Sequence, residues 1–169
     1  MKHLRFTSVL AAAAMAATIS GGASAADPEN TIFLDLEYGR VVIELRPDLA
    51  PVTVARIKEL ARQKFYDGTP FHRVIPGFMA QGGDPTGTGT SGSGKKLKAE
   101  FSNEKHVRGT VSMARAQSPD SADSQFFICF ATASHLDGQY TVWGKVVKGM
   151  EFVDKIKKGS GGGGTVSDP

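Results

Sequence analysis

Short runs of β-forming residues recur along the chain between residues 31 and 147, and several of them are bordered by glycine or proline. The first two runs, in 31–45, flank Tyr38-Gly39, and their partial apolar–polar alternation predicts a β-hairpin with glycine at positive φ. Two more strand pieces are bent at Pro76-Gly77, a turn pair. Altogether the later strands are predicted at 71–75, 78–81, 109–114, 124–130 and 140–147. With no internal repeat and 40% hydrophobic residues in 169, the pattern favours one antiparallel sheet or barrel in a single domain.

Two helices are predicted between and after these strands. The first starts at Pro51 and places apolar residues at helical spacing, with proline suited to the first turn. The second is predicted over 150–157. Residues 82–94 are rich in glycine, serine and threonine and predict an exposed loop. The Gly-rich segment 159–169 is expected not to pack.

The N-terminus has the three parts of a secretory signal peptide. Lys2 and Arg5 give a positive start, an Ala-rich apolar run spans 9–19, and small residues precede a cleavage position after Ala25. The run is too short for the ~20 apolar residues of a membrane span, although a buried N-terminal helix is an alternative. We therefore expect 1–25 to be removed and 26–169 to form the mature, exported domain without a membrane anchor.

Charge and cysteine content exclude several classes of protein. The precursor has 20 basic and 17 acidic residues, and 1–25 contains two basic and no acidic ones, so the mature chain has 18 against 17. Such a balance gives no reason to expect a nucleic-acid partner. With one cysteine, Cys129, no internal disulfide can form, and inside an apolar strand this thiol is expected to be inert.

Other motifs give no cofactor, metal or nucleophile. Residues 89–96, GTSGSGKK, resemble a phosphate-binding loop, but Lys96 replaces the magnesium-binding hydroxyl and no hydrophobic strand precedes it. The histidines His72, His106 and His135 are widely spaced and lack metal-ligand spacing. No G-x-S-x-G elbow for a hydrolase is present.

Residues 71–84, FHRVIPGFMAQGGD, place Arg73 among apolar side chains. Arg73 could cover core residues with its stem while its head reaches water. Alternatively, it could border an apolar pocket together with Gln81. The segment 124–130, SQFFICF, leaves the same choice open, because both faces of that strand are apolar. Either the strand is buried on both sides, or one face lines a pocket.

The 71–84 segment resembles the signature of the cyclophilins, the peptidyl-prolyl cis-trans isomerases. Segments 109–116, 124–130 and 135–150 agree with that family in order, and the resemblance extends over 31–158. It implies a mainly β fold, a closed eight-stranded antiparallel barrel capped by two α-helices, with the site on its outer surface. The chain stops at Pro169, before the final strand that family members usually have, so that strand is expected to be absent.

The resemblance also implies which residues act. The catalytic positions fall on Arg73 and Gln81. The substrate-binding positions fall on Phe78, Met79, Ala114, Arg115, Ala116, Gln125, Phe127, His135, Leu136 and Tyr140. His135 stands where many eukaryotic members carry a tryptophan, so weak cyclosporin binding is expected, and Tyr140 stands where a pocket histidine is usual.

The function implied is isomerisation of X–Pro bonds in unfolded or flexible polypeptides, without metal or cofactor, by a bacterial, exported, monomeric protein. It would assist folding in the periplasm, or beyond it if the protein is secreted. The alternative is a proline-peptide-binding chaperone that uses the same cleft without turnover. Arg73 favours the enzyme, since holding a proline ring needs only the apolar pocket.

Overall fold

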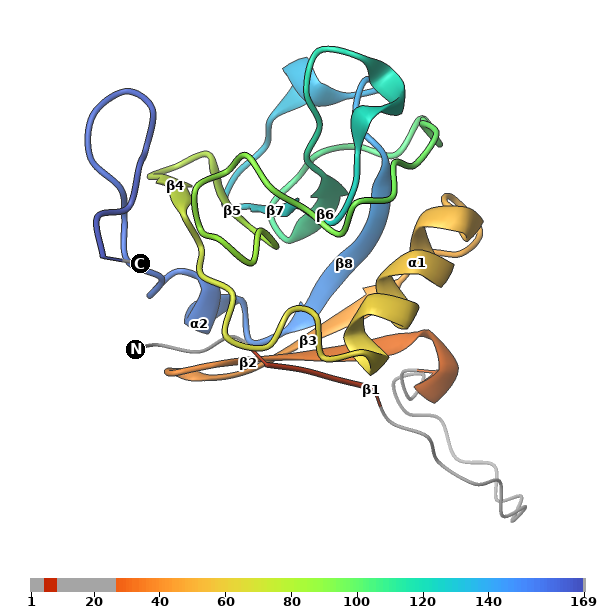
Figure 1. Cartoon of the computed structure of the whole chain (residues 1–169), viewed down its shortest axis with the longest axis horizontal. Helices are drawn as coiled ribbons and strands as arrows, with labels where there is room; N and C mark the ends of the chain where they lie inside the picture. Colours follow the sequence, from red (N-terminus) through yellow and green to blue (C-terminus); the bar gives the residue numbers. More distant parts are fainter. Residues whose placement is uncertain (1–4, 9–26, 169) are drawn as a thin grey trace.

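The computed structural model describes residues 5–8 and 27–168 (Figure 1). Apart from the strand β1 (Arg5–Ser8), the predicted signal peptide lies outside the described residues. Among the described residues, no helix has the length and apolar character required to cross a membrane.

One sheet forms the body of the molecule, in the strand order β1-β2-β3-β8-β6-β7-β5-β4. All the pairs in this order are antiparallel. The remaining strands are β2 (Thr31–Leu36), β3 (Gly39–Leu45), β4 (Arg73–Ile75), β5 (Met79–Gly82), β6 (Thr110–Met113), β7 (Phe126–Cys129) and β8 (Val142–Lys148). The helices are α1 (Pro51–Arg62) and α2 (Met150–Val153), with 3-10 turns η1 (Pro28–Asn30), η2 (Pro119–Ser121) and η3 (Ser134–Leu136).

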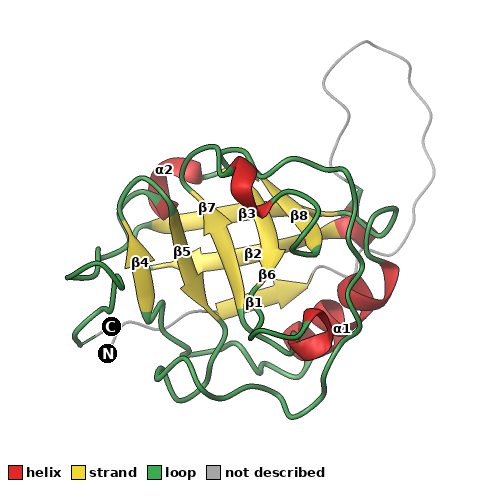
Figure 2. Cartoon of the chain, turned by 90° about the horizontal axis from the view of Figure 1, so that it is seen from above, coloured by secondary structure: helices red, strands yellow, loops and turns green. Residues whose placement is uncertain are grey.

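The sheet is curled but open, so the prediction of a closed eight-stranded barrel is wrong. Seven strands lie between Thr31 and Lys148, and β1 adds an eighth at one end of the order. The end strands β1 and β4 do not pair with each other. Figure 2 shows β4, β5 and β7 running across the direction of β1, β2 and β3. The mainly β architecture with two helices is confirmed, α1 and α2 lying at opposite ends of the curled sheet (Figure 1).

The hairpin and the first helix depend on a glycine, a proline and one distant carboxylate. Gly39 begins β3 directly after the turn at Glu37-Tyr38 and has φ +144°, and a Cβ there would come within 2.6 Å of the Phe152 ring of α2. Pro51 opens α1, whose N-cap Ala50 has no side-chain cap. Glu100 supplies that cap, since its carboxylate accepts hydrogen bonds from the backbone N–H groups of Val52 and Thr53. The predicted second helix is shorter than expected, because α2 ends at Val153.

The alternation along β7 divides its side chains between two apolar clusters. Phe126 and Ile128 point into the main core, where the Phe126 ring makes edge contacts with Tyr66, Phe71 and Trp143 at 5.8–6.1 Å. Phe127 and Cys129 point to the opposite face and join a second cluster with Met79 and Leu136. Both faces are therefore apolar because each packs against its own cluster.

The Gly-rich C-terminal segment packs against β4, so the prediction that it cannot pack is wrong. Val74 N–H donates to the carbonyl of Gly164 at 2.7 Å, and Val166 N–H donates to the carbonyl of His72 at 3.0 Å. Val166 itself is buried. Gly164 has φ +68°, and a Cβ there would collide with Ile75 and the Val74 backbone. Glycine therefore permits the close approach that the segment needs.

Candidate active site

Strand register places the two predicted catalytic side chains in one row. Arg73 on β4 pairs with Gln81 on β5, and Gln81 pairs with Phe127 on β7. Directly paired residues project from the same face of a sheet. The turn at Gly77, with φ +71°, sets this register by bringing β4 back along β5. The row lies on the outer face, away from the main core that holds Phe126.

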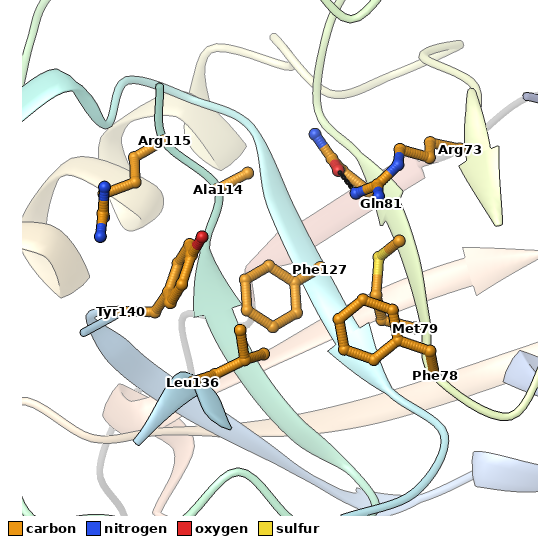
Figure 3. Close-up of a pocket in the computed structure, with 9 residues that line it drawn as sticks. All are labelled: Arg73, Phe78, Met79, Gln81, Ala114, Arg115, Phe127, Leu136 and Tyr140. Carbon is orange, nitrogen blue, oxygen red and sulfur yellow. Dashed lines mark hydrogen bonds between the residues drawn. The ribbon is translucent and has the colours of Figure 1, made fainter. Parts of the chain in front are cut away.

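A hollow opens beside this row (Figure 3). Its apolar side is formed by Phe127 and Met79, both almost fully buried, together with Phe78 and Leu136. The complete lining is Arg73, Phe78, Met79, Gln81, Ala114, Arg115, Phe127, Leu136 and Tyr140. In Figure 3 the Arg73 head and the Gln81 amide lie at one end of the hollow, and Tyr140 and Leu136 lie across it.

Hydrogen bonds fix the guanidinium of Arg73. Nη1 donates to Oε1 of Gln81 at 3.1 Å, and Nε donates to the carbonyl oxygen of Gly163 at 3.0 Å. Within residues 5–8 and 27–168, no carboxylate forms a salt bridge with Arg73. Its charge therefore remains available at the edge of the hollow, and the remaining N–H groups can donate to a bound molecule.

A chain of amide contacts holds Gln81 in turn. Its Nε2 donates to Oε1 of Gln125 at 3.0 Å, and Nε2 of Gln125 donates to the carbonyls of Gly89 and Ser91 at 2.9 and 2.8 Å. Because Gln81 must present its oxygen to Arg73, the orientation of both amides follows from this chain.

Asp84 organises the loop at the end of that chain. The residue is fully buried and accepts hydrogen bonds from Thr86 N–H and Oγ1 at 2.8 Å each and from Ser91 N–H at 3.1 Å. Burial by itself would raise the pKa of the Asp84 carboxyl, but the hydrogen bonds from Thr86, Ser91 and Gly89 lower that pKa to about 2. The loop over 82–94 is therefore anchored from below, although it was expected only to be exposed.

Aromatic contacts fix the far wall. Phe127 and Tyr140 meet edge to face, with ring centroids 5.7 Å apart. The Arg115 guanidinium lies over the Tyr140 ring at 4.7 Å and donates to the carbonyls of Gln139, Ala116 and Gln117. Tyr140 is thus held between a cation and Phe127, which favours one ring orientation.

Nine of the twelve predicted site residues line the hollow, and three lie next to it. Ala116 and Gln125 line an adjoining hollow that also includes Lys96 and Asp123 and shares Gln81, Ala114 and Arg115. His135 packs against Phe78, with ring centroids 5.4 Å apart, and does not line the hollow. Arg73 borders the hollow, which agrees with the pocket interpretation of this residue. For 124–130 both interpretations apply, because β7 is buried on both faces and Phe127 also lines the hollow.

Three residues that support the site were not predicted from the sequence. Gly163 gives only a backbone carbonyl, so no side-chain pattern could reveal it. Asp84 stands at the end of the 71–84 segment, and only its Asx-like hydrogen bonds to the following threonines could have indicated its role. His106, discarded as a metal ligand, stacks on Phe127 with ring centroids 6.1 Å apart.

The discarded motifs offer no alternative chemistry. Cys129 is fully buried, and burial raises the pKa of its thiol to about 12, so little thiolate is available as a nucleophile. Among the described residues, no group of three histidine, cysteine or carboxylate side chains could hold a metal ion. The arrangement can hold an apolar ring and direct a fixed cationic donor at a polar atom beside it.

Comparison with known proteins identifies close relatives of this architecture. The family described as "Cyclophilin type peptidyl-prolyl cis-trans isomerase/CLD" matches residues 31–168. A "Probable peptidyl-prolyl cis-trans isomerase" of Brucella suis is 58% identical over 168 residues, covering 90% of this chain and 86% of the relative. "Peptidyl-prolyl cis-trans isomerase B" of Bacillus subtilis is 46% identical over 129 residues, covering 75% and 90%. The crystal structure of a Cryptosporidium parvum cyclophilin type peptidyl-prolyl cis-trans isomerase in the presence of the dipeptide Ala-Pro superposes with a TM-score of 0.75 at 32% identity, covering 82% and 92%.

Proposed function

Because this chain belongs to the cyclophilin family and is a peptidyl-prolyl cis-trans isomerase, we propose that Arg73 is its catalytic residue and that the hollow receives the proline ring. The observation that carries the proposal is the row Arg73–Gln81–Phe127 across three strands. It sets a permanent cation without a carboxylate partner in the described chain beside an apolar hollow.

The chemistry follows from the electronic structure of the amide. Rotation about a peptide bond meets a barrier of ~18–20 kcal/mol, because the nitrogen lone pair is delocalised into the carbonyl. At the half-turned state the lone pair is localised on the prolyl nitrogen, which then accepts a hydrogen bond. A donor that bonds only this state lowers the barrier, because it does not stabilise either planar isomer to the same extent as the twisted state.

Arg73 has the properties that this role requires. Its guanidinium stays protonated and offers donors in a rigid fork. Nε and one Nη1 hydrogen are bound to Gly163 and Gln81, so the group has little to reorganise when a substrate arrives. The free donors can bond the prolyl nitrogen and hold the carbonyl of the proline itself, while the preceding residue turns.

The hollow would clamp the pyrrolidine ring against Phe127, Met79 and Leu136 and exclude water from Arg73. Water exclusion strengthens each polar contact to the substrate. Ala114, Arg115, Ala116 and Gln125 would bond the substrate backbone beside the ring. The Ala-Pro dipeptide named with the Cryptosporidium parvum relative supports X–Pro segments of unfolded or flexible chains as substrates.

Export and the monomeric state also belong to this proposal. The basic start, Ala-rich run and small residues of 1–25 support export to the periplasm or beyond. Mass spectrometry of the protein from fractionated host cells tests this, with a mature chain starting at Ala26 expected outside the cytoplasm. Sedimentation of the purified chain tests the monomer. Weak cyclosporin binding is expected because His135 stands where many eukaryotic family members carry a tryptophan, and competition with a proline peptide measures it.

The decisive experiment separates turnover from binding. Exchange NMR on a proline tetrapeptide follows cis–trans interconversion at equilibrium, and line broadening of the same peptide reports binding. The isomerase accelerates exchange at catalytic concentrations of protein. A chain that bound the peptide and left its exchange rate unchanged would instead be the proline-binding chaperone, and the role given to Arg73 would fall.

A further inference from the structure

A buried polar group lies directly behind the hollow and has no part in the function proposed above. Nε2 of His106 lies 2.9 Å from Oγ of Ser112, and Nδ1 of His106 lies 3.1 Å from Oδ1 of Asp137. These contacts link serine, histidine and aspartate in the same way as the hydrogen bonds of a Ser-His-Asp hydrolase triad. However, His106 and Ser112 are fully buried, and a nucleophile must reach its substrate. The group is therefore not a nucleophilic site, and its effect is on the position of the side chains that it contacts.

The protonation of this group follows from its contacts. The Asp137 carboxylate can only accept, and its Oδ1 also receives the backbone N–H of His106 at 2.8 Å. Nδ1 must therefore carry the ring proton, so that Nε2 accepts from the Ser112 hydroxyl. Burial lowers the pKa of His106, while its backbone N–H lowers the pKa of Asp137, which also pairs with Lys105 at 3.3 Å. A neutral ring bonded at both nitrogens cannot turn freely.

That fixed ring contacts the walls of the hollow. It stacks on Phe127 with centroids 6.1 Å apart and planes at 20°, and it meets Tyr140 edge to face at 6.4 Å. Asp137, which holds the ring, directly follows Leu136 in the chain. Figure 3 shows these three walls, Phe127, Tyr140 and Leu136, grouped around the hollow. Ser112 on β6 also pairs with Phe127 on β7, so the residue that bonds the histidine ring lies beside a wall of the hollow.

We propose that His106 is a positioning residue for isomerisation, which holds the Phe127 and Tyr140 rings so that the hollow fits a proline ring. The inference rests on the function proposed for the hollow. A clamp on the proline ring acts on both planar isomers and on the twisted state alike. Loosening it should therefore raise KM and change kcat little.

Two variants test this role from different sides. Ser112→Ala keeps the imidazole but removes the hydroxyl that donates to Nε2. His106→Asn keeps a donor for Asp137 but removes the ring that stacks on Phe127. For each we expect KM for a proline tetrapeptide to rise roughly three- to tenfold, with kcat changed by less than about twofold.

The matched control is Thr53→Val, which removes another buried hydroxyl. Thr53 bonds Glu100 at 2.7 Å at the start of α1 and does not line the hollow. This control should lose stability by a comparable amount, measured by urea unfolding, with KM unchanged. If Ser112→Ala and His106→Asn match the control in KM, or lower kcat alone, His106 is merely structural and the inference is overturned.

Two further measurements test the positioning role of His106 independently of the kinetics. NMR of ¹⁵N-labelled histidine should show wild-type His106 with the proton on Nδ1, and ring flips of Phe127 should speed up in Ser112→Ala. Protonation on Nε2, or unchanged flips, would contradict the proposal. Phe127→Ala separates the two claims. If it raises KM while the His106 and Ser112 variants do not, only this inference fails, whereas an unchanged KM for Phe127→Ala overturns the assigned hollow as well.

Discussion

Nε of Arg73 donates a 3.0 Å hydrogen bond to the carbonyl of Gly163, 90 residues further along the chain. The contact ties the guanidinium to the Gly-rich segment that runs beside β4. Together with Gln81 on the other side, it leaves the guanidinium little freedom to turn away from the hollow. Such a preset donor costs little reorganisation when the substrate twists.

Displacing this segment should impair catalysis. Gly164→Ala places a Cβ against Ile75 and the Val74 backbone at φ +68°, so the segment must move and carry the Gly163 carbonyl away from Arg73. We expect kcat/KM on a proline tetrapeptide to fall roughly three- to tenfold. Gly162→Ala, where a Cβ meets nothing within 4 Å, is the matched control and should keep full activity. Equal rates for the two variants would show that Gly163 does not position Arg73.

Neighbouring phenylalanines of β7 should separate stability from binding. Phe126→Leu weakens edge contacts in the main core and should cost roughly 1–2 kcal/mol of unfolding free energy, with KM unchanged. Phe127→Ala removes a wall of the hollow and should raise KM roughly tenfold or more. Urea unfolding and steady-state kinetics measure the two effects. A Phe127→Ala variant with unchanged KM would refute the assignment of the hollow.

Acid should destabilise the protein through its buried histidines. Burial lowers the pKa of His72, and neither of its ring nitrogens has a hydrogen-bond partner in the described chain. Asp84 and Arg73 influence this pKa in opposite directions, Asp84 raising it and Arg73 lowering it. The pKa of His72 is lower in the folded chain than the unfolded value of 6.5. The contribution of His72 to the free energy of unfolding is therefore fully present above pH 6.5, and it is lost as the pH falls below that value and the unfolded chain takes up protons.

Urea unfolding of wild type and His72→Leu at pH 8 and pH 5.5 measures this effect. The wild type should lose more unfolding free energy than His72→Leu between the two values. The contribution of His106 has the same sign and is common to both proteins. If both proteins lose the same free energy, the neutral, buried state of His72 is wrong.

Local patterns in the sequence account for parts of the row of site residues. The turn at Pro76-Gly77 forces Arg73 opposite Gln81, and the alternation in β7 puts Phe126 and Phe127 on opposite faces. These relations depend on residues within a few positions of one another. The pairing of Gln81 with Phe127 joins distant strands. The family resemblance, and no local pattern, assigned these residues to one site together with Leu136 and Tyr140.

The parts that failed depend on contacts between distant segments. A Gly-rich composition predicted an unpacked C-terminal segment, yet the missing side chains are what allow Gly164 to approach Val74. The stacking of His106 on Phe127 joins a loop to a strand and leaves no periodic signal. The prediction of a closed barrel was wrong for a similar reason. Pairing between the end strands depends on the curvature of the whole sheet rather than on any one strand.

Substitutions at position 73 test whether the Arg73 guanidinium stabilises the half-turned amide. Isomerisation of a proline tetrapeptide is measured for wild type, Arg73→Lys and Arg73→Ala, with peptide binding measured in parallel. We expect Arg73→Ala to lower kcat roughly 10²–10³-fold while peptide binding changes far less. Arg73→Lys, with one charge but no rigid fork, should fall between them. A kcat for Arg73→Ala within about twofold of wild type would show that the Arg73 guanidinium does not stabilise the half-turned amide.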